Sequence, residues 1–283
     1  MKIILGTAQS IPGYGITNDK EYVDMNALID KFYSLGGRDI DTAPAYADAE
    51  RIIGSSLKSF NITTKIPRMK VRSSREYISN LEHTLEASLK NLNASSIEHL
   101  LIHDLESFLE NIDKNLIKFI ESLKTKGLIK NFGASVYNTH ELDNILERID
   151  LDSIQFPLNP FNQIFLSDRF IKLVQSKNIK TFARSIYMQG LLASEHDASA
   201  SRFQKWSNNF LDWFLACQEL KISPADGCLQ FIKGISFLDG FIVGVTSTQE
   251  LETVFKSHNN INAEFFKKFR MDDDALLDPR NWK

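Results

Sequence analysis

The feature that most limits the fold of this chain is a repeated unit, in which a short apolar run is followed by a segment of helical periodicity. Short runs rich in Ile, Leu, Val and Phe are typical of buried strands, and longer segments with apolar residues at a spacing of three or four are typical of helices. The expected strands cover residues 2–5, 38–41, 62–66, 97–103, 132–136, 153–157, 179–183 and 241–243. The expected helices cover residues 22–35, 49–57, 76–92, 114–126, 141–149, 168–176 and 248–256.

Eight strands at these intervals predict an α/β fold, and they describe a closed (β/α)8 TIM barrel better than an open doubly wound sheet. The chain has 283 residues, of which 43% are hydrophobic, so it can bury one large core. We expect residues 1–283 to form a single domain, with an irregular insertion around residues 194–202. Thr17 to Lys20 offer capping residues for the first helix, and Ser73 forms a capping box with Glu76.

Charge and composition exclude several classes of function. Lysine and arginine total 33 and aspartate and glutamate 36, a net charge of −3 without the long basic runs of a nucleic-acid-binding surface. No apolar stretch has the ~18 residues of a membrane span, and the first apolar run is too short for a secretory signal. We expect a cytoplasmic protein. Cys217 and Cys228 suit a buried, reduced pair, and the histidines lack the spacing of metal ligands.

Four residues with complementary chemistry stand at or just beyond the ends of successive expected strands: Asp41, Tyr46, Lys65 and His103. A barrel gathers such positions at one end. Tyrosine side chains, with a pKa of ~10, are poor acids unless a neighbouring cation stabilises the phenolate. Lys65 supplies such a cation, Asp41 its counterion, and His103 a group to orient a carbonyl oxygen. This set suits carbonyl reduction.

The motifs around these residues resemble those of the aldo-keto reductase superfamily in order and spacing, over nearly the whole chain. They are Asp41-Thr-Ala-Pro-Ala-Tyr46-Ala-Asp-Ala-Glu50, Thr64-Lys65, Leu101-Ile-His103 and Gly133-Ala-Ser135. The resemblance implies that the four residues form a catalytic tetrad with Tyr46 as the acid. It also implies a nicotinamide cofactor held without a Rossmann fold, which agrees with the lack of a Gly-x-Gly-x-x-Gly motif.

The resemblance further implies a set of cofactor-binding residues: Thr7, Asp41, Ser135, Gln155, Arg184, Ser185, Gly190, Thr246, Ser247 and Gln249. Ser135 and Gln155 match positions that hold the nicotinamide carboxamide, but Val136 replaces the usual asparagine. Arg184 stands where an aromatic residue commonly stacks on the nicotinamide. Its cation would disfavour the oxidised ring and favour the reduced cofactor. Arg184 could instead pair with a substrate carboxylate or a structural acid.

The segment after the last strand, Gly244 to Glu250, bears on the choice of cofactor. It lacks the Lys or Arg with which relatives that prefer NADP grip the 2′-phosphate. Thr246 and Ser247, together with the free amides of a helix N-terminus, still offer phosphate contacts. We therefore expect NADPH as the cofactor, with NADH nearly equal. Ser247 has a second interpretation, since with Glu250 it forms a capping box that merely starts a helix.

Further motifs resemble bacterial members linked to surface-polysaccharide biosynthesis. They are Leu5-Gly-Thr-Ala-Gln9, Gln189-Gly-Leu-Leu192 and Leu277-Asp-Pro-Arg-Asn-Trp282. The expected partner is a small carbonyl compound, including sugar derivatives, and the expected assembly is a monomer or small homo-oligomer. Substrate contacts should come from the loops with Tyr14, Arg68 and residues 185–202. Arg68 could meet an anionic substrate or be exposed.

Two other functions remain open at the level of sequence. A regulatory or scaffold subunit would bind the cofactor with weak or vestigial reductase activity, and Val136 and Arg184 are the departures that favour it. The intact tetrad argues against this interpretation. A barrel lyase or isomerase would instead use Lys65 as a Schiff-base amine.

Overall fold

A computed structural model describes residues 1–11, 13–15, 23–194, 201–258 and 261–282. Its centre is a closed barrel of eight parallel strands in chain order, in which β1 pairs with both β2 and β8. The strands are β1 (Lys2–Gly6), β2 (Asp39–Asp41), β3 (Asn61–Ile66), β4 (Ile97–Ile102), β5 (Ile129–Ser135), β6 (Ser153–Pro157), β7 (Lys180–Arg184) and β8 (Gly240–Val243). The expected TIM barrel is confirmed, and the strand bounds differ from the expected ones by at most one residue, except that β5 begins three residues earlier.

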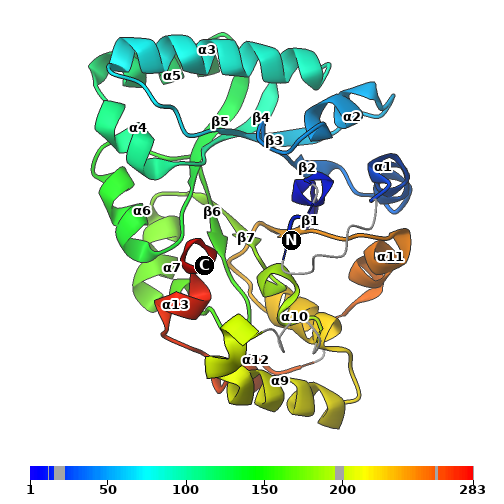
Figure 1. Cartoon of the computed structure of the whole chain (residues 1–283). Coiled ribbons are helices and arrows are strands. Elements are labelled where there is room, and N and C mark those ends of the chain that lie inside the picture. Colours follow the sequence, from blue (N-terminus) through cyan, green and yellow to red (C-terminus); the bar gives the residue numbers. More distant parts are fainter. Residues whose placement is uncertain (12, 16–22, 195–200, 259–260, 283) are drawn as a thin grey trace.

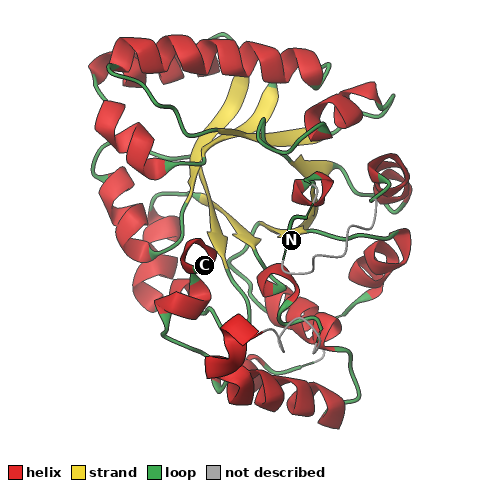
Figure 2. Ribbon diagram, viewed as in Figure 1, coloured by secondary structure: helices red, strands yellow, loops and turns green. Residues whose placement is uncertain are grey.

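Helices surround this barrel (Figures 1 and 2). The α-helices in the described part of the chain are α1 (Met25–Ser34), α2 (Ala49–Ser55), α3 (Ser74–Asn91), α4 (Leu105–Asn111), α5 (Lys114–Thr125), α6 (Thr139–Leu146), α7 (Asp168–Ser176), α9 (Ser207–Glu219), α10 (Pro224–Lys233), α11 (Thr248–Lys256), α12 (Ala263–Lys267) and α13 (Asp274–Leu277). The seven expected helices are all present, and those at 168–176 and 248–256 have the expected bounds. None of these helices is long and apolar enough to span a membrane.

Apolar residues at helical spacing hold the outer helices on the barrel. In α3 the buried residues Tyr77, Leu81 and Leu85 recur every fourth position and therefore share one face. The expected capping box is confirmed at the start of this helix, because Ser73 Oγ accepts from the Glu76 amide at 3.2 Å. The residues expected to cap the first helix, Thr17 to Lys20, lie outside the described part of the chain. In the described part, Asp24 caps α1 by accepting from the Ala27 amide.

Five helices were not expected from sequence: α4, α9, α10, α12 and α13. The insertion expected to be irregular around residues 194–202 leads, from Ser201 onward, into a 3-10 helix (Ser201–Trp206) and then α9. That expectation was wrong for the described residues 201 and 202, because aromatic side chains anchor this region in the core. Trp213 is fully buried, and its indole N–H donates to the Leu192 carbonyl at 2.9 Å.

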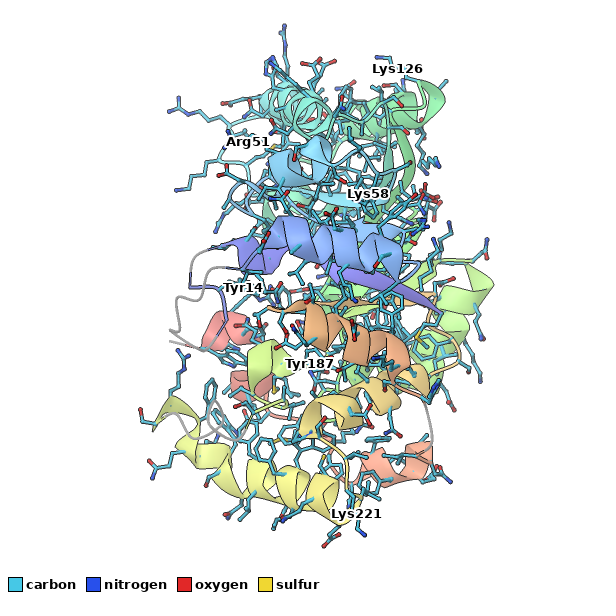
Figure 3. All side chains as sticks on the ribbon, turned by 90° about the vertical axis from the view of Figure 1, so that its right-hand side faces the viewer. Tyr14, Arg51, Lys58, Lys126, Tyr187 and Lys221 are labelled. Atoms are coloured by element: carbon cyan, nitrogen blue, oxygen red, sulfur yellow. The ribbon has the colours of Figure 1, made fainter. Side chains whose placement is uncertain are left out.

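The interior also confirms the expectation for the two cysteines. Cys217 and Cys228 are both buried and free of a disulfide, and burial raises the pKa of Cys217 to about 12. A thiol in this environment stays protonated and behaves as a small apolar side chain. Apart from Asp41, Glu50 and Lys65, the acidic, lysine and arginine side chains in the described part of the molecule are at least partly exposed. Figure 3 shows Lys126 and Lys221 at the two ends of the molecule and Tyr14 and Tyr187 near its middle.

Candidate active site

Barrel topology brings the four candidate catalytic residues together. Asp41 is the last residue of β2, Lys65 lies one residue before the end of β3, and His103 directly follows β4. Parallel pairing places Asp41 opposite Thr63 and Lys65 opposite Leu101, so neighbouring strands present these side chains at the same end of the barrel. Tyr46 follows in the loop between β2 and α2. All four residues line one cavity.

A buried ion pair forms the base of this site. Lys65 Nζ donates to Asp41 Oδ1 at 2.5 Å and to the Thr42 carbonyl at 2.9 Å, and Gln155 Nε2 donates to Asp41 Oδ2 at 2.7 Å. Lys65 is only 2% exposed and Asp41 only 4% exposed. Burial lowers the pKa of Lys65, but the Asp41 carboxylate and Tyr46 together raise that pKa by more, so it lies above the ordinary value. The ammonium therefore keeps its proton in the interior.

Tyr46 and His103 stand over this ion pair. The Lys65 ammonium lies 4.9 Å from the centre of the Tyr46 ring, and the rings of Tyr46 and His103 meet edge to face with centroids 6.2 Å apart. Burial, with the cations of Lys65 and Arg184, lowers the pKa of His103 to about 3. His103 is consequently neutral at pH 7 and can donate one hydrogen bond from its ring. A phenol, an ammonium and a neutral imidazole thus face the same cavity.

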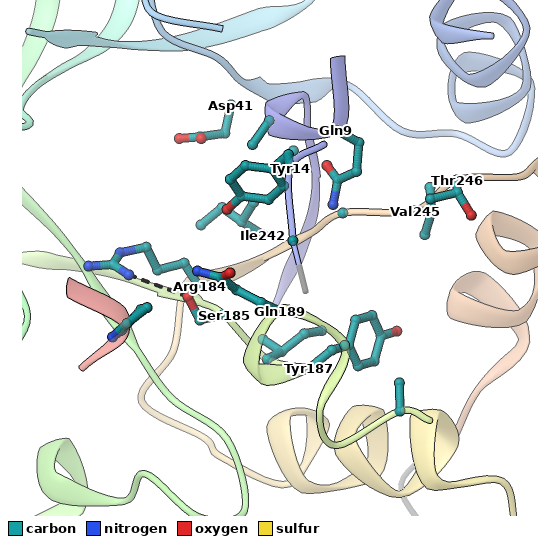
Figure 4. A pocket seen from close by; sticks show the side chains of 18 of the residues that line it. Gln9, Tyr14, Asp41, Arg184, Ser185, Tyr187, Gln189, Ile242, Val245 and Thr246 are labelled. Carbon is teal, nitrogen blue, oxygen red and sulfur yellow. Dashed lines mark hydrogen bonds between the residues drawn. The ribbon is translucent and has the colours of Figure 1, made fainter. Parts of the chain in front are cut away.

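The cavity has a volume of about 890 Å³ and extends from the tetrad to the loop after β8 and the first turns of α11. Figure 4 shows Asp41, Tyr14 and Arg184 on one side and Thr246 on the other. Six of the residues expected to bind cofactor, besides Asp41, line this cavity: Ser135, Gln155, Arg184, Ser185, Gly190 and Thr246. The structure therefore brings most of the expected cofactor residues into one space with the tetrad.

Three expected cofactor residues do not line the cavity. Thr7 is buried, and its hydroxyl donates to the Asp41 carbonyl at 3.0 Å, which supports the end of β2 from behind. Ser247 caps α11 by accepting from the Glu250 amide at 3.2 Å, as its second interpretation proposed. Gln249 is exposed and accepts from the Thr248 hydroxyl. Each side chain is accounted for by a local structural contact.

Of the residues expected to contact substrate, some line the cavity and others do not. Tyr14 lines the cavity, and burial, with the nearby Tyr46, raises the pKa of Tyr14 to about 12. Arg68 is exposed, pairs with Glu106 at 3.5 Å and lies outside the cavity lining. Residues 185–187, 189, 190, 193 and 194 contribute to the lining, and residues 195–200 lie outside the described part of the chain.

Arg184 makes several contacts with its neighbours. Its Nε donates to Ser135 Oγ at 3.2 Å, Nη1 to Ser185 Oγ at 3.3 Å and Nη2 to the Val136 carbonyl at 3.2 Å. Its guanidinium carbon also lies 4.1 Å from the centre of the Tyr137 ring. Val136 thus contributes its backbone to holding Arg184, and its side chain is buried in the core.

Sequence reasoning did not identify Tyr137, Glu250 and Arg280 as cavity residues. Tyr137 follows the end of β5 by two residues. Because functional residues of a barrel gather just beyond the ends of its strands, this position could have been predicted from sequence. Arg280 comes from the C-terminal segment and carries no comparable signal in the sequence. No group of three or more histidine, cysteine, aspartate or glutamate residues in the described part of the chain could hold a metal ion.

Several features of the cavity fit a dinucleotide cofactor. Gln9 lines the cavity, and its buried Oε1 has no hydrogen-bond partner among the described residues. A ligand hydroxyl could donate to this oxygen. Gly244 packs against Gln9 so closely that a Cβ atom there would come within 1.7 Å of the glutamine side chain. The cavity volume is also in the range of sites that hold cofactors.

Comparisons with known proteins agree with this geometry. Residues 2–271 match the model of the aldo/keto reductase family. D-arabinose 1-dehydrogenase of Saccharomyces cerevisiae is 24% identical over an alignment that covers 92% of this chain and 84% of the yeast protein. Aldo-keto reductase family 1 member A1 of Mus musculus is 28% identical over 51% of this chain and 52% of the mouse protein.

Solved structures share the fold at low sequence identity. The holo form of an aldo-keto reductase from Bacillus halodurans has a TM-score of 0.72 at 14% identity, covering 95% of this chain and 90% of the other. The glycerol dehydrogenase of Gluconobacter oxydans has a TM-score of 0.69 at 20% identity, covering 99% and 91%. Because the family model extends over nearly the whole barrel, the chain belongs to the aldo/keto reductase family and is an NAD(P)H-dependent oxidoreductase.

Proposed function

We propose that this protein reduces the carbonyl group of an aldehyde, ketone or keto-sugar to an alcohol, with Tyr46 as the general acid. The observation that carries the proposal is the buried Lys65–Asp41 pair beneath the Tyr46 ring. A protonated ammonium beside a phenol stabilises the phenolate that remains after proton transfer. Asp41 keeps that ammonium protonated and fixed in place, and Gln155 holds the second carboxylate oxygen.

The steps divide the work among the residues of the tetrad. The reduced nicotinamide, when bound, supplies a hydride to the carbonyl carbon. Tyr46 gives its hydroxyl proton to the carbonyl oxygen as the carbon–oxygen double bond becomes single. Neutral His103 donates a hydrogen bond to the same oxygen and orients it toward Tyr46. Solvent then returns a proton to Tyr46, and the alcohol leaves.

The cofactor would lie along the rest of the cavity. Ser135 Oγ accepts from Arg184 and retains its own proton to donate to the carboxamide oxygen. Gln155 uses its amide nitrogen on Asp41 and retains its oxygen to accept from the carboxamide nitrogen. Ser185, Gly190 and Gln9 line the path toward β8. Roles in cofactor binding for Thr7, Ser247 and Gln249 would need contacts other than those of the cavity lining.

The choice between NADPH and NADH depends on the far side of the cavity. Glu250 accepts from the Thr246 amide at 2.8 Å and from the Thr246 hydroxyl at 3.2 Å. These two groups would otherwise be free for a 2′-phosphate, and the carboxylate adds a negative charge beside it. We therefore propose use of both cofactors, with the advantage expected for NADPH removed by Glu250.

The substrate class follows from the relatives and from the cavity. The yeast relative is a D-arabinose dehydrogenase and the Gluconobacter protein a glycerol dehydrogenase, both named for hydroxylated compounds. Polar side chains near the tetrad include Tyr14, Tyr137 and Gln189, which can bind hydroxyl groups. A sugar or sugar-derived carbonyl compound is the substrate class that we propose.

Tyr46→Phe tests the mechanism, because it removes the acidic proton and leaves the ring. We expect the rate of carbonyl reduction to fall by about 100-fold or more, since general acid catalysis contributes factors of 10²–10⁴. The dissociation constant for NADH, from fluorescence titration, should change by less than about twofold, because removing one hydroxyl leaves the cofactor cavity intact. Tyr33→Phe is the matched control, since Tyr33 lies outside the cavity lining.

Two outcomes would count against this function. Full activity of Tyr46→Phe would show that another group supplies the proton. Tight cofactor binding by the wild-type protein, with no turnover over a broad panel of aldehydes, ketones and sugars, would indicate the regulatory subunit considered from sequence.

A further inference from the structure

The charged residues that line the cavity are Asp41, Lys65, Arg184, Glu250 and Arg280. Asp41 and Lys65 neutralise each other. Glu250 accepts a hydrogen bond from the Thr246 amide, and Thr246 lies across the cavity from Arg184 (Figure 4). Arg280 is bound by two carboxylates, those of Glu141 and Asp278. Among the described residues, no carboxylate lies within ion-pair distance of Arg184, so its guanidinium has no direct counterion among them.

The guanidinium of Arg184 also has unused donors. Of its five N–H groups, three donate to Ser135, Ser185 and the Val136 carbonyl. All three acceptors are uncharged. One N–H on each terminal nitrogen is left without an acceptor among the described residues. A partly buried guanidinium without a counterion is unfavourable, and an anion that takes these two donors relieves the cost.

Neighbouring residues hold this guanidinium in a defined place. Arg184 and Arg280 both stack on the Tyr137 ring, with their guanidinium carbons 4.1 Å and 3.9 Å from its centre. The Glu141 carboxylate accepts hydrogen bonds from the Tyr137 amide and from the Arg280 guanidinium. Tyr137 is therefore held through both its backbone and its ring. A preorganised guanidinium loses less conformational entropy when it binds an oxyanion.

The position of Arg184 distinguishes a substrate anion from the phosphates of the cofactor. Its Nε bonds Ser135, which lies at the end of β5 next to Gln155 in the strand register. Its charge also contributes to the lowered pKa of His103. Both observations place the guanidinium at the reacting end of the cavity, whereas the phosphates of a dinucleotide lie away from its nicotinamide.

We propose that Arg184 binds an anionic substituent of the substrate, so that the preferred substrates are carbonyl compounds carrying a carboxylate or a phosphate group. This inference rests on the proposed carbonyl reduction and adds the charge of the substrate to it. Tyr137 and Arg280 act as positioning residues for Arg184. Only one N–H on each terminal nitrogen is needed, which matches two oxygen atoms of one oxyanion.

Matched pairs of substrates test the proposal with saturating NADH. Butanal is compared with 4-oxobutanoate, and glyceraldehyde with glyceraldehyde 3-phosphate, by kcat/KM. The wild-type protein should prefer the anionic member of at least one pair. Arg184→Gln should lower kcat/KM for that member by about ten- to hundredfold, the range expected for hydrogen bonds to charged groups, and for its neutral partner by a clearly smaller factor.

Three further variants serve as controls. Arg68→Gln removes an exposed arginine outside the cavity and should leave both values unchanged. Tyr137→Phe keeps the stacked ring and should keep the preference for the anion. Tyr137→Leu removes the ring and should reduce that preference. Equal losses for charged and neutral substrates in Arg184→Gln, or no preference in the wild-type protein for either pair, would overturn the proposal.

Binding measurements separate failure of this proposal from failure of the proposed function. Succinate and inorganic phosphate are titrated by calorimetry into the NADH-loaded protein and its Arg184→Gln variant. Binding of either anion that Arg184→Gln weakens supports the anion site even when no aldehyde is reduced. Binding of neither anion to the wild-type protein overturns it. A weaker affinity for NADH in Arg184→Gln, with the substrate preference retained, would instead assign the guanidinium to the cofactor.

Discussion

At the scale of single residues, Asp41 determines the charge state of the site. Its two carboxylate oxygens have separate partners, Lys65 and Gln155, which come from β3 and β6. The Thr7 hydroxyl and amide both donate to its backbone carbonyl. Both carboxylate oxygens and the backbone carbonyl of Asp41 are therefore hydrogen-bonded. These bonds hold the carboxylate and the Lys65 ammonium in place beside Tyr46.

Asp41→Asn should destabilise the protein and reduce its activity, because it leaves the buried Lys65 ammonium without a counterion. We expect the free energy of unfolding, measured in urea, to fall by about 3 kcal/mol, the lower end for a broken buried pair. Asp39→Asn on the same strand is the control. Asp39 pairs with the half-exposed Lys2, and its loss should cost less than about 1 kcal/mol. Equal losses in the two variants would contradict this account.

At the scale of elements, the loops and helix starts at one end of the barrel determine what the cavity can bind. The connection between β7 and β8 is the longest described, and its helix α10 contributes Ala225 and Leu229 to the lining. The loop before α11 contributes Thr246, and the first turn of α11 contributes Glu250. The Glu250 amide donates to Ser247 Oγ, and the Glu250 carboxylate accepts from the Thr246 amide. These two amides at the start of the helix therefore have hydrogen-bond acceptors within the same segment.

Glu250→Gln should shift the preference between cofactors toward NADPH. The substitution removes a negative charge close to the Thr246 amide and keeps a side chain of similar size. An exposed charge contributes up to about 1 kcal/mol, so we expect the ratio of dissociation constants for NADPH and NADH to fall by about fivefold. Fluorescence titration with both cofactors measures this ratio. Glu252→Gln, on the same helix but outside the cavity lining, should leave it unchanged.

At the scale of the whole molecule, one closed barrel joins residues that are far apart in sequence. The C-terminal segment with Pro279 and Arg280 reaches back to the first turn of α6, where Arg280 pairs with Glu141. The interior of the barrel also holds polar groups, among them His99, whose Nδ1 lies 2.9 Å from Ser153 Oγ. Such groups couple the stability of the fold to pH.

Stability should decrease in mild acid. Burial lowers the pKa of His99 to about 4, from 6.5 in an unfolded chain. Between these values the unfolded state binds more protons than the folded state, so the free energy of unfolding falls as the pH falls. One such group contributes up to about 1.4 kcal/mol per pH unit. In urea unfolding between pH 6.5 and 4.5, His99→Gln should flatten this dependence, and the exposed His83→Gln should not. If the free energy of unfolding changed with pH equally steeply in both variants, groups other than His99 would be responsible for the loss of stability in acid.

Much of the fold and the centre of the site could be predicted from sequence because both follow from local signals. The alternation of apolar runs and helical segments indicated the eight strands, and a barrel places the ends of all its strands together. Asp41, Lys65 and His103 stand at such ends, so their convergence followed from the order of elements alone. The capping box at Ser73 is likewise a contact between residues three positions apart.

The remaining features depend on contacts that no local pattern encodes. Tyr137 and Arg280 are separated by most of the second half of the chain, and they meet only because the C-terminal segment folds over the end of the barrel. The lack of a carboxylate beside Arg184, in the part of the chain that the structure describes, is equally a property of packing, since it depends on which acids other residues engage. The sequence by itself determined the barrel and the tetrad, through periodicity and strand order. Only the tertiary structure decided the charge balance of the cavity, because electrostatic pairing depends on distance in space.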